Sequence, residues 1–289
     1  MKAKRVILQA LLVLMPTVAM AQSEGVKFID DKTLYEVIQL AAGQQKLVFV
    51  DCYATWCGPC KMMTNNEFPK KEAGDYFNAK FVCAKFDMER GEGPEIARKY
   101  KVTAYPTFLV LDGRGEMVHR VVGADEITSF IKRVEAGLTG KSIADYQREY
   151  GQGERGEQFL REYLNVLMMQ HMRSDGAQVT RELIGGRDAD AVIRDTLLFR
   201  AYITQCLPGP DDALFLSVCK ARELVRRLQG DDAEQALVYL WNNAFLSARR
   251  EGRLDAQLIG RLKQQMAACG FAAEGDALAA RYQQASGRE

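Results

Sequence analysis

Two cysteines separated by two residues are the strongest chemical signal in this chain of 289 residues. Cys57 and Cys60 enclose Gly58 and Pro59, and Trp56 precedes them. Two intervening residues on a first helical turn bring the second sulfur within bonding reach of the first, so the pair can alternate between dithiol and disulfide. A cysteine at a helix N-terminus is favoured as thiolate by unpaired N–H groups and the helix dipole, and proline suits the first turn. The spacing predicts Cys57 as the nucleophile and Cys60 as the resolving thiol.

An acidic residue interrupts the apolar run that leads into this pair. Asp51 lies between Val50 and Cys52, in a stretch that otherwise reads as a buried parallel strand. A carboxyl taken into an apolar strand must be paired or protonated, because desolvation disfavours its charged form. Asp51 therefore requires an explanation, either in chemistry or in structure.

Strands alternate with helices from residue 22 to about 140, which predicts an α/β domain. A hairpin is expected around Gly113 and Gly115, where two apolar runs are separated by turn residues. The predicted strands are 46–53, 81–86, 107–111 and 116–122, and the predicted helices are 33–42, one starting at the cysteine pair, 94–100 and 124–138.

The run from Asp51 to Lys61 resembles the active site of the thioredoxin family, and the order of elements matches that family over residues 26–138. A bare pair of cysteines is a moderate signal, but Trp-Cys-Gly-Pro-Cys between a strand and a helix is a specific one. The resemblance implies a thioredoxin fold and a protein thiol–disulfide oxidoreductase. It implies no metal and no cofactor beyond the redox-active disulfide Cys57–Cys60. The pair Gly58-Pro59 is typical of members that reduce their targets.

The resemblance also assigns roles to residues outside the cysteine pair. Asp51 matches a buried aspartate that takes the proton of the resolving cysteine, and Lys85 matches a lysine beside that aspartate. The alternative is a structural ion pair between Asp51 and Lys85, since such pairs also perturb pKa values. Pro106 matches a cis-proline loop that faces the cysteines and docks substrate as an added strand. The predicted substrate-binding residues are Trp56, Gly58, Pro59, Tyr105, Pro106 and Gly123.

The chain departs from a plain thioredoxin between the cysteine pair and the strand at Phe81. The extra length from Thr64 to Lys80 is more similar to exported thioredoxin-like domains of bacterial thiol–disulfide interchange proteins. The substrate range of cytosolic thioredoxin therefore cannot be transferred to this chain.

Residues 141–289 form a second predicted domain, which is all-α and reads as an array of helical hairpins. Helical spacing of apolar residues is clearest over 159–171, 191–206, 213–228 and 233–249, and no fixed period identifies a known repeat. This half offers no cysteine pair and no phosphate-binding loop, so we expect it to bind a protein partner or the substrate. The alternative is a domain that stabilises or dimerises the protein.

Residues 1–21 read as a signal peptide, with a basic start at Lys2, an apolar run to Met15 and a cleavage site at Ala19 to Ala21. The alternative is an uncleaved anchor, but the apolar run is shorter than the roughly 20 residues that span a bilayer. We therefore expect a protein secreted across the inner membrane into the periplasm. An exported reductase needs electrons, which implies a thiol donor in the membrane.

The net charge and the other cysteines limit which further partners and disulfides are expected. The formal net charge is +1 and no run of five like charges occurs, so no nucleic-acid partner is predicted. Five other cysteines are expected to stay free, namely Cys52, Cys83, Cys206, Cys219 and Cys269.

Two alternatives to a reductase remain open. A disulfide oxidase or isomerase would use the same residues and differ in reduction potential. A copper carrier would use both thiolates as soft ligands, with His119 and His171 as the two histidines of the chain.

Overall fold

A five-stranded sheet organises the N-terminal half of the computed structural model, which describes residues 25–286. The predicted signal peptide, residues 1–21, lies outside the described residues. Along the sheet the strand order is β1-β3-β2-β4-β5; β1, β3 and β2 run parallel, and β4 and β5 are antiparallel to their neighbours. The strands are β1 (Phe28–Ile29), β2 (Leu47–Tyr53), β3 (Phe81–Asp87), β4 (Thr107–Leu111) and β5 (Met117–Val122).

The central strand β2 has apolar side chains on both faces, as its continuous apolar run predicted. Side chains alternate with a period of two, so Phe49 points to one face while Val48 and Val50 point to the other. Phe49 packs there with Phe77 and Phe130, at ring-centroid distances of 4.5 and 6.2 Å. The helices of this half are α1 (Leu34–Gly43), α2 (Gly58–Met62), α3 (Lys71–Lys80), α4 (Gly93–Lys99) and α5 (Ile127–Ala136).

The extra length after the cysteine pair continues α2 through a π-helical turn, η1 (Met63–Glu67), and then forms α3. The Glu67 side chain is buried, and its Oε2 accepts hydrogen bonds from the Ile127 backbone N–H and from Lys70 Nζ, both at 2.7 Å. Ile127 is the first residue of α5, where N–H groups have no partner within the helix. Glu67 therefore caps α5 and ties the inserted segment to the sheet.

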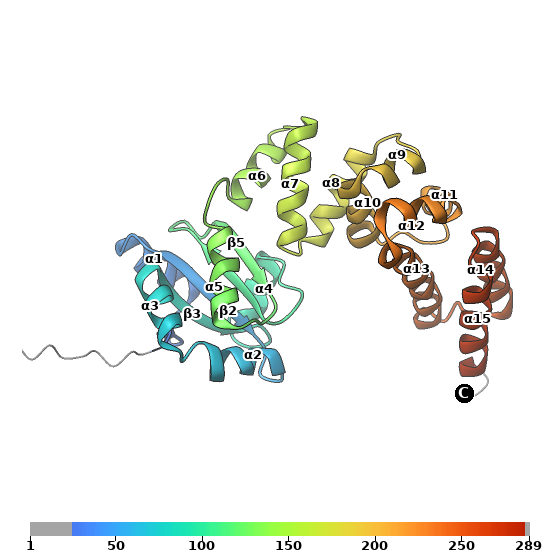
Figure 1. Cartoon of the computed structure of the whole chain (residues 1–289). Helices are drawn as coiled ribbons and strands as arrows, with labels where there is room; N and C mark the ends of the chain where they lie inside the picture. Colours follow the sequence, from blue (N-terminus) through green and yellow to red (C-terminus); the bar gives the residue numbers. More distant parts are fainter. Residues whose placement is uncertain (1–24, 287–289) are drawn as a thin grey trace, which may run out of the picture.

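The C-terminal half is helical throughout its described part, and in Figure 1 it extends from the β5 side of the sheet, with α14 and α15 farthest away. Its elements are α6 (Ile143–Gly151), α7 (Glu157–Met169), α8 (Arg173–Ile184), α9 (Ala189–Arg194), α10 (Thr196–Ala201), η2 (Tyr202–Cys206), α11 (Ala213–Lys220), α12 (Arg222–Gln229), α13 (Asp231–Arg250), α14 (Ala256–Ala268) and α15 (Ala272–Ser286). The predicted fold class, a thioredoxin fold followed by an all-α half, is confirmed.

Two long helices predicted from the sequence are broken in the structure. The stretch 191–206 is divided at Asp195, whose side chain caps the start of α10 by accepting from the Leu198 N–H. The stretch 213–228 is divided at Ala221, where the backbone leaves helical geometry. An aspartate inside an apolar periodic run begins a new helix because its side chain satisfies N–H groups that would otherwise lack a partner.

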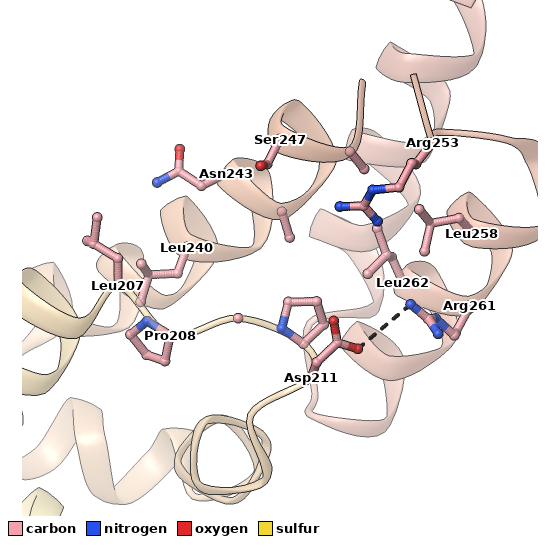
Figure 2. Close-up of a pocket in the computed structure, with 14 residues that line it drawn as sticks. Leu207, Pro208, Asp211, Leu240, Asn243, Ser247, Arg253, Leu258, Arg261 and Leu262 are labelled. Carbon is pink, nitrogen blue, oxygen red and sulfur yellow. Dashed lines mark ion pairs between the residues drawn. The ribbon is translucent and has the colours of Figure 1, made fainter. Parts of the chain in front are cut away.

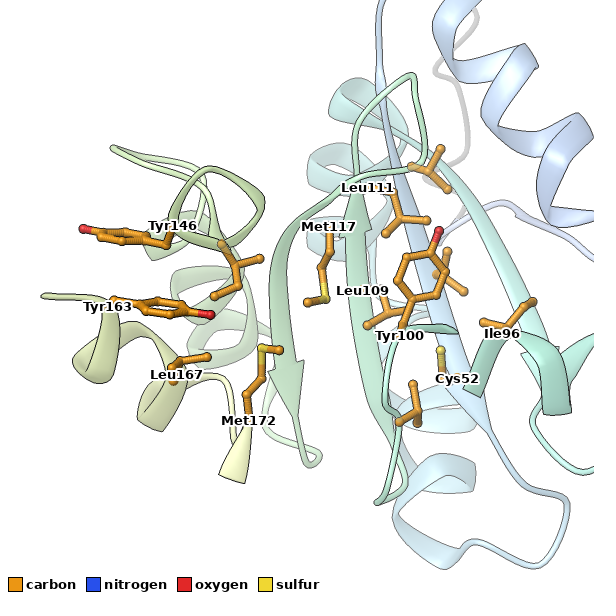
Figure 3. Packing of buried hydrophobic residues seen from close by; sticks show 14 of the residues in the cluster. Cys52, Ile96, Tyr100, Leu109, Leu111, Met117, Tyr146, Tyr163, Leu167 and Met172 are labelled. Carbon is orange, nitrogen blue, oxygen red and sulfur yellow. The ribbon is translucent and has the colours of Figure 1, made fainter. Parts of the chain in front are cut away.

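The two halves share one apolar cluster across the outer face of β5. Met117 of β5 and Leu109 of β4 belong to the same cluster as Tyr146 of α6 and Tyr163 and Leu167 of α7, as Figure 3 shows. The rings of Tyr146 and Tyr163 stack with their centroids 5.6 Å apart. The helical half therefore covers part of the sheet. The domain boundary near residue 140 stays a prediction, and it requires that residues 22–140 fold without the helical half.

Polar contacts reinforce the junction between the halves. Lys101 follows α4, and its Nζ donates to both carboxylate oxygens of Asp175 in α8, at 2.7 and 2.9 Å. Arg120 of β5 is 3% exposed and donates to the Tyr100 carbonyl. The loop that follows α4 is thus held against the first turn of α8.

Within residues 25–286 no helix has the length and hydropathy required to cross a bilayer.

Candidate active site

Cys57 and Cys60 are joined by a disulfide where β2 runs into α2. Their Cα atoms are 5.3 Å apart, and the two residues are 2% and 3% exposed. Ala54 completes their buried cluster, against which Tyr53 and Tyr105 pack. Because both sulfurs are nearly covered, a substrate must dock closely against this surface to reach them.

Cys57 is the N-cap residue of α2, and its Sγ accepts a hydrogen bond from the Cys60 backbone N–H at 3.1 Å. The first turn of a helix presents N–H groups without partners, which stabilise a negative charge at this atom. Gly58 and Pro59 fill that turn and are exposed. The local structure thus favours the thiolate form of Cys57 after reduction.

Asp51 is 1% exposed in the middle of β2, and its Oδ1 has no hydrogen-bond partner among residues 25–286. Burial raises the pKa of this carboxyl to about 7, and the charge of Lys85 opposes the shift. An aspartate with this pKa can exchange a proton near neutral pH, which an ordinary exposed aspartate cannot do.

Lys85 lies opposite Asp51 in the register of β3 against β2. Its Nζ is 3.9 Å from Oδ2 of Asp30, a carboxylate that is 71% exposed, and no ion pair joins it to Asp51. The long lysine side chain reaches the surface of the sheet, whereas the short aspartate stays inside. The structural ion pair considered from the sequence does not form, and Lys85 acts on Asp51 through its charge alone.

Trp56 and Tyr105 form an exposed aromatic edge beside the disulfide. Their rings meet edge to face with centroids 6.0 Å apart, and Trp56 is 66% exposed. The indole Nε1 of Trp56 donates to Glu89 Oε1 at 2.9 Å. Sequence reasoning missed Glu89, which follows the carboxyl end of β3. Parallel strands end at the same edge of a sheet, so the adjacency of β3 to β2 would have indicated this position.

The loop before β4 contains the cis peptide bond between Tyr105 and Pro106, as predicted. The Gly123 N–H donates to the Pro106 carbonyl at 2.9 Å, so these two predicted residues are neighbours. The register of β4 with β2 begins at Thr107, which leaves the Tyr105 backbone outside the sheet ladder. A substrate strand can therefore pair with the chain at Tyr105.

The other five cysteines are free, as expected from the sequence. Burial raises the pKa of the Cys83 thiol to about 12 and that of the Cys52 thiol still further, so neither is a thiolate at neutral pH. Cys219 of α11 and Cys269 after α14 are buried in the same apolar cluster, and the Cys269 thiol donates to the carbonyl of Leu216, also in α11, at 3.7 Å. Sequence spacing did not indicate this proximity, because the two cysteines are fifty residues apart.

Among the described residues, no three His, Cys, Asp or Glu side chains gather as a metal-binding group. A separate pocket of about 300 Å³ lies in the helical half beside the loop from Leu207 to Asp211, which joins η2 to α11 (Figure 2). Asp211 of this loop forms an ion pair with Arg261 of α14 at 3.8 Å. The part of this pocket that the structure describes contains neither a cysteine nor a histidine.

The arrangement supports one kind of chemistry. A sulfur held at a helix N-terminus can attack a disulfide, its partner cysteine can displace the product, and the loop backbone at Tyr105, which lies outside the sheet ladder, can hold the target. The chain is accordingly a thiol–disulfide oxidoreductase.

Comparison with known proteins identifies the family. The thioredoxin family model matches residues 26–136. A thioredoxin-like protein of Synechocystis, slr0233, is 35% identical over 97 residues, which cover 34% of this chain and 87% of that protein. A thioredoxin of Echinococcus granulosus is 40% identical over 91 residues, or 32% of this chain and 78% of its own length. The solution structure of a disulphide-isomerase candidate from Bacteroides thetaiotaomicron is 43% identical, with 42% of this chain and 100% of that chain covered at a TM-score of 0.38. The chain belongs to the thioredoxin family.

Proposed function

We propose that this protein is an exported reductase of protein disulfides. The observation that supports disulfide exchange best is the position of Cys57 at the N-cap of α2, with the Cys60 N–H directed at its sulfur. This environment stabilises the Cys57 thiolate, which is the nucleophile that attacks a substrate disulfide. The reducing direction is supported by the pair Gly58-Pro59, which is typical of reducing family members.

The proposed reaction proceeds in two exchanges. The Cys57 thiolate attacks one sulfur of a substrate disulfide, forms a mixed disulfide and releases the other substrate sulfur as a thiolate. Asp51 then accepts the proton of Cys60, and the Cys60 thiolate attacks Cys57 Sγ. The second substrate sulfur leaves as a thiolate, and the Cys57–Cys60 disulfide is restored. The substrate gains two electrons and the enzyme loses two.

The substrate is proposed to lie along the chain at Tyr105 and Pro106, where the backbone is outside the sheet ladder. Trp56 and Tyr105 provide an apolar edge, and Gly123 stabilises the loop through its bond to the Pro106 carbonyl. Protein thiols and disulfides are therefore the expected partners.

The apolar segment before residue 22 supports an address outside the cytoplasm, in the periplasm. A reductase at that location must itself be reduced, and a membrane protein carrying a thiol pair is the proposed electron donor. Cell fractionation, with N-terminal sequencing of the mature protein, tests the address; a cytoplasmic protein that keeps residues 1–21 would contradict it.

The direction of the reaction is tested by the reduction potential of the Cys57–Cys60 pair, equilibrated with glutathione or dithiothreitol buffers. A value near about −270 mV, which is typical of thioredoxin, supports a reductase, and a value near about −120 mV supports an oxidase. An intermediate value, combined with the reshuffling of a scrambled substrate, would support an isomerase. Insulin reduction by the purified full-length chain is the matching activity assay.

A further inference from the structure

Two adjoining hollows lie where the helical half meets the loop before Tyr105. The smaller, of about 220 Å³, lies between Lys101 and Thr103 on one side and the first turn of α8 on the other. The larger, of about 640 Å³, lies between the end of α7, α10 and η2. His171 and Arg173 line both, so the hollows form one depression, which we call the α7–α10 groove.

One end of the groove is lined by the loop that leads to the redox site. Thr103 lines it and lies two residues before Tyr105, a separation that spans at most about 7 Å of extended chain. Tyr105 in turn packs against the cluster formed around Cys57 and Cys60. A protein whose disulfide is bound at Cys57 therefore has its neighbouring residues within reach of this groove.

The lining is strongly biased toward positive charge. Four cations, from Lys101, Arg120, Arg173 and Arg200, line the groove against a single carboxylate, that of Asp175, among the residues described. Lys101 already binds both oxygens of Asp175. Arg173 and Arg200 are exposed, and neither forms an ion pair within residues 25–286.

Many other arginines of the helical half differ in this respect. Arg161, for example, is paired with Asp195 at 2.6 Å, and Arg194 is paired with Asp190 at 2.7 Å. Unpaired cations in a depression attract an acidic partner, because complementary charge across an interface speeds encounter and sets register.

The same groove has an apolar component. Met168 and Met169 of α7 and Leu197 of α10 line its larger hollow, and Met169 is 66% exposed. Methionine side chains are flexible and polarizable, so a surface that contains them adapts to different apolar partners. A binding surface of this kind suits several substrates that share charge and not shape.

We propose that the α7–α10 groove binds an acidic segment of the protein substrate that also carries apolar side chains. The segment lies across Arg173 and Arg200 while the substrate disulfide is bound at Cys57. This inference rests on the proposed reductase function and adds the class of substrate. It also gives the helical half a role in selecting which disulfides are reduced.

The experiment uses the full-length chain and three synthetic peptides that share one intramolecular disulfide. Their tails contain aspartate and leucine, serine and leucine, or lysine and leucine. The expected kcat/KM is highest for the acidic tail, about fivefold above the serine tail for two exposed charge contacts, and lowest for the lysine tail. Added salt should reduce the difference, since exposed charges are screened.

Charge reversal identifies the site. Arg173→Glu combined with Arg200→Glu should abolish or invert the preference for the acidic tail and leave reduction of a small neutral disulfide unchanged. Arg227→Glu, in an exposed position of α12 that does not line the groove, is the matched control and should keep the preference. Equal values for all three tails, or a preference that survives the double reversal, would overturn the proposal.

A binding assay separates this inference from the proposed function. The same peptides with both cysteines replaced by serine are labelled, and their binding is followed by fluorescence anisotropy. Tighter binding of the acidic peptide, lost in the double reversal, supports the groove even if no disulfide is reduced. If no peptide binds and the protein self-associates instead, a second copy occupies the groove and the inference is wrong.

Discussion

Asp51 and Lys85 are register partners on adjacent strands, yet the Lys85 ammonium lies 3.9 Å from Asp30 and forms no ion pair with Asp51. The carboxyl of Asp51 is consequently left buried with an unpartnered oxygen. A purely structural carboxylate would be expected to be paired, because an unpaired buried charge is destabilising. Burial raises the pKa of Asp51 to about 7 and so makes its proton exchangeable near neutral pH, while the charge of Lys85 opposes that shift.

Replacement of Asp51 by Asn should slow the second exchange and spare the first. The mixed disulfide at Cys57 forms without the carboxylate, but its release needs a base for the Cys60 proton. In the parent protein, release should accelerate as pH rises through about 7, where Asp51 ionises, and this inflection should disappear in the variant. Stopped-flow measurement of both steps between pH 5.5 and about 8.5 covers that pKa. Identical pH profiles would leave Asp51 without a role in the reaction.

The same substitution should stabilise the fold in a pH-dependent way. Well below pH 3.8, Asp51 is protonated in both the folded and the unfolded chain, so its ionisation does not affect stability. As pH rises from 3.8 to about 7, the unfolded chain ionises while the folded chain does not, so the parent protein loses stability relative to Asp51→Asn. Above pH 7 the difference should level off, on the order of 3 to 4 kcal/mol from a shift of about three pKa units. Urea unfolding of the oxidised proteins at acidic and alkaline pH measures it; a pH-independent difference would show that the pKa of Asp51 is ordinary.

Replacing either cysteine by serine should stop the reaction, but at different steps. Cys57→Ser should reduce disulfide reduction to the uncatalysed level, because no nucleophile remains at the helix N-terminus. Cys60→Ser should still attack and then accumulate as a mixed disulfide, because the resolving thiol is lost. Non-reducing electrophoresis and mass spectrometry after mixing with substrate distinguish the outcomes. Turnover by Cys57→Ser would contradict the assignment of the nucleophile.

Glu89 should influence substrate affinity through Trp56. Its carboxylate accepts the indole N–H at 2.9 Å and so limits the rotation of an otherwise exposed ring beside Tyr105. Glu89→Ala should raise KM for a protein substrate by about twofold to tenfold, the effect of one charge-assisted hydrogen bond partly exposed to water, with kcat nearly unchanged. Glu95→Ala, an exposed glutamate on α4, is the control. A fall in kcat with constant KM would mean that Glu89 acts on the reaction and not on the ring.

Removal of the helical half should weaken the remaining domain without removing its chemistry. A fragment of residues 22–140 keeps Asp51, Cys57 and Cys60, so it should still reduce a generic disulfide such as that of insulin. It also exposes Met117, which is buried beneath α6 and α7 in the full chain, and should lose at least about 2 kcal/mol of unfolding free energy. A fragment of residues 22–184 retains that cover and serves as the control. Equal urea midpoints for the two fragments would show that the shared cluster contributes little to stability.

Local chemistry in the sequence was enough to predict much of this protein. The cysteine spacing, the apolar strand that carries Asp51 and the proline at residue 106 are short-range patterns, and each depends on backbone geometry within a few residues. The strand pattern of residues 46–53 predicted β2 to within one residue, because a strand buried on both faces must be apolar along its length.

Tertiary structure decided the contacts that join residues distant in the chain. Glu89 accepts the indole N–H of Trp56, Glu67 caps α5, and Cys219 and Cys269 lie in one buried cluster, because strand order and helix packing place them together. No periodicity encodes such pairs, since they depend on which side chains share a face after the whole chain has folded. The groove between α7 and α10 has the same origin. Arg173 and Arg200 read as isolated surface cations in the sequence, and only the packing of α7, α8 and α10 places them in one depression, which Thr103 of the loop before Tyr105 also lines.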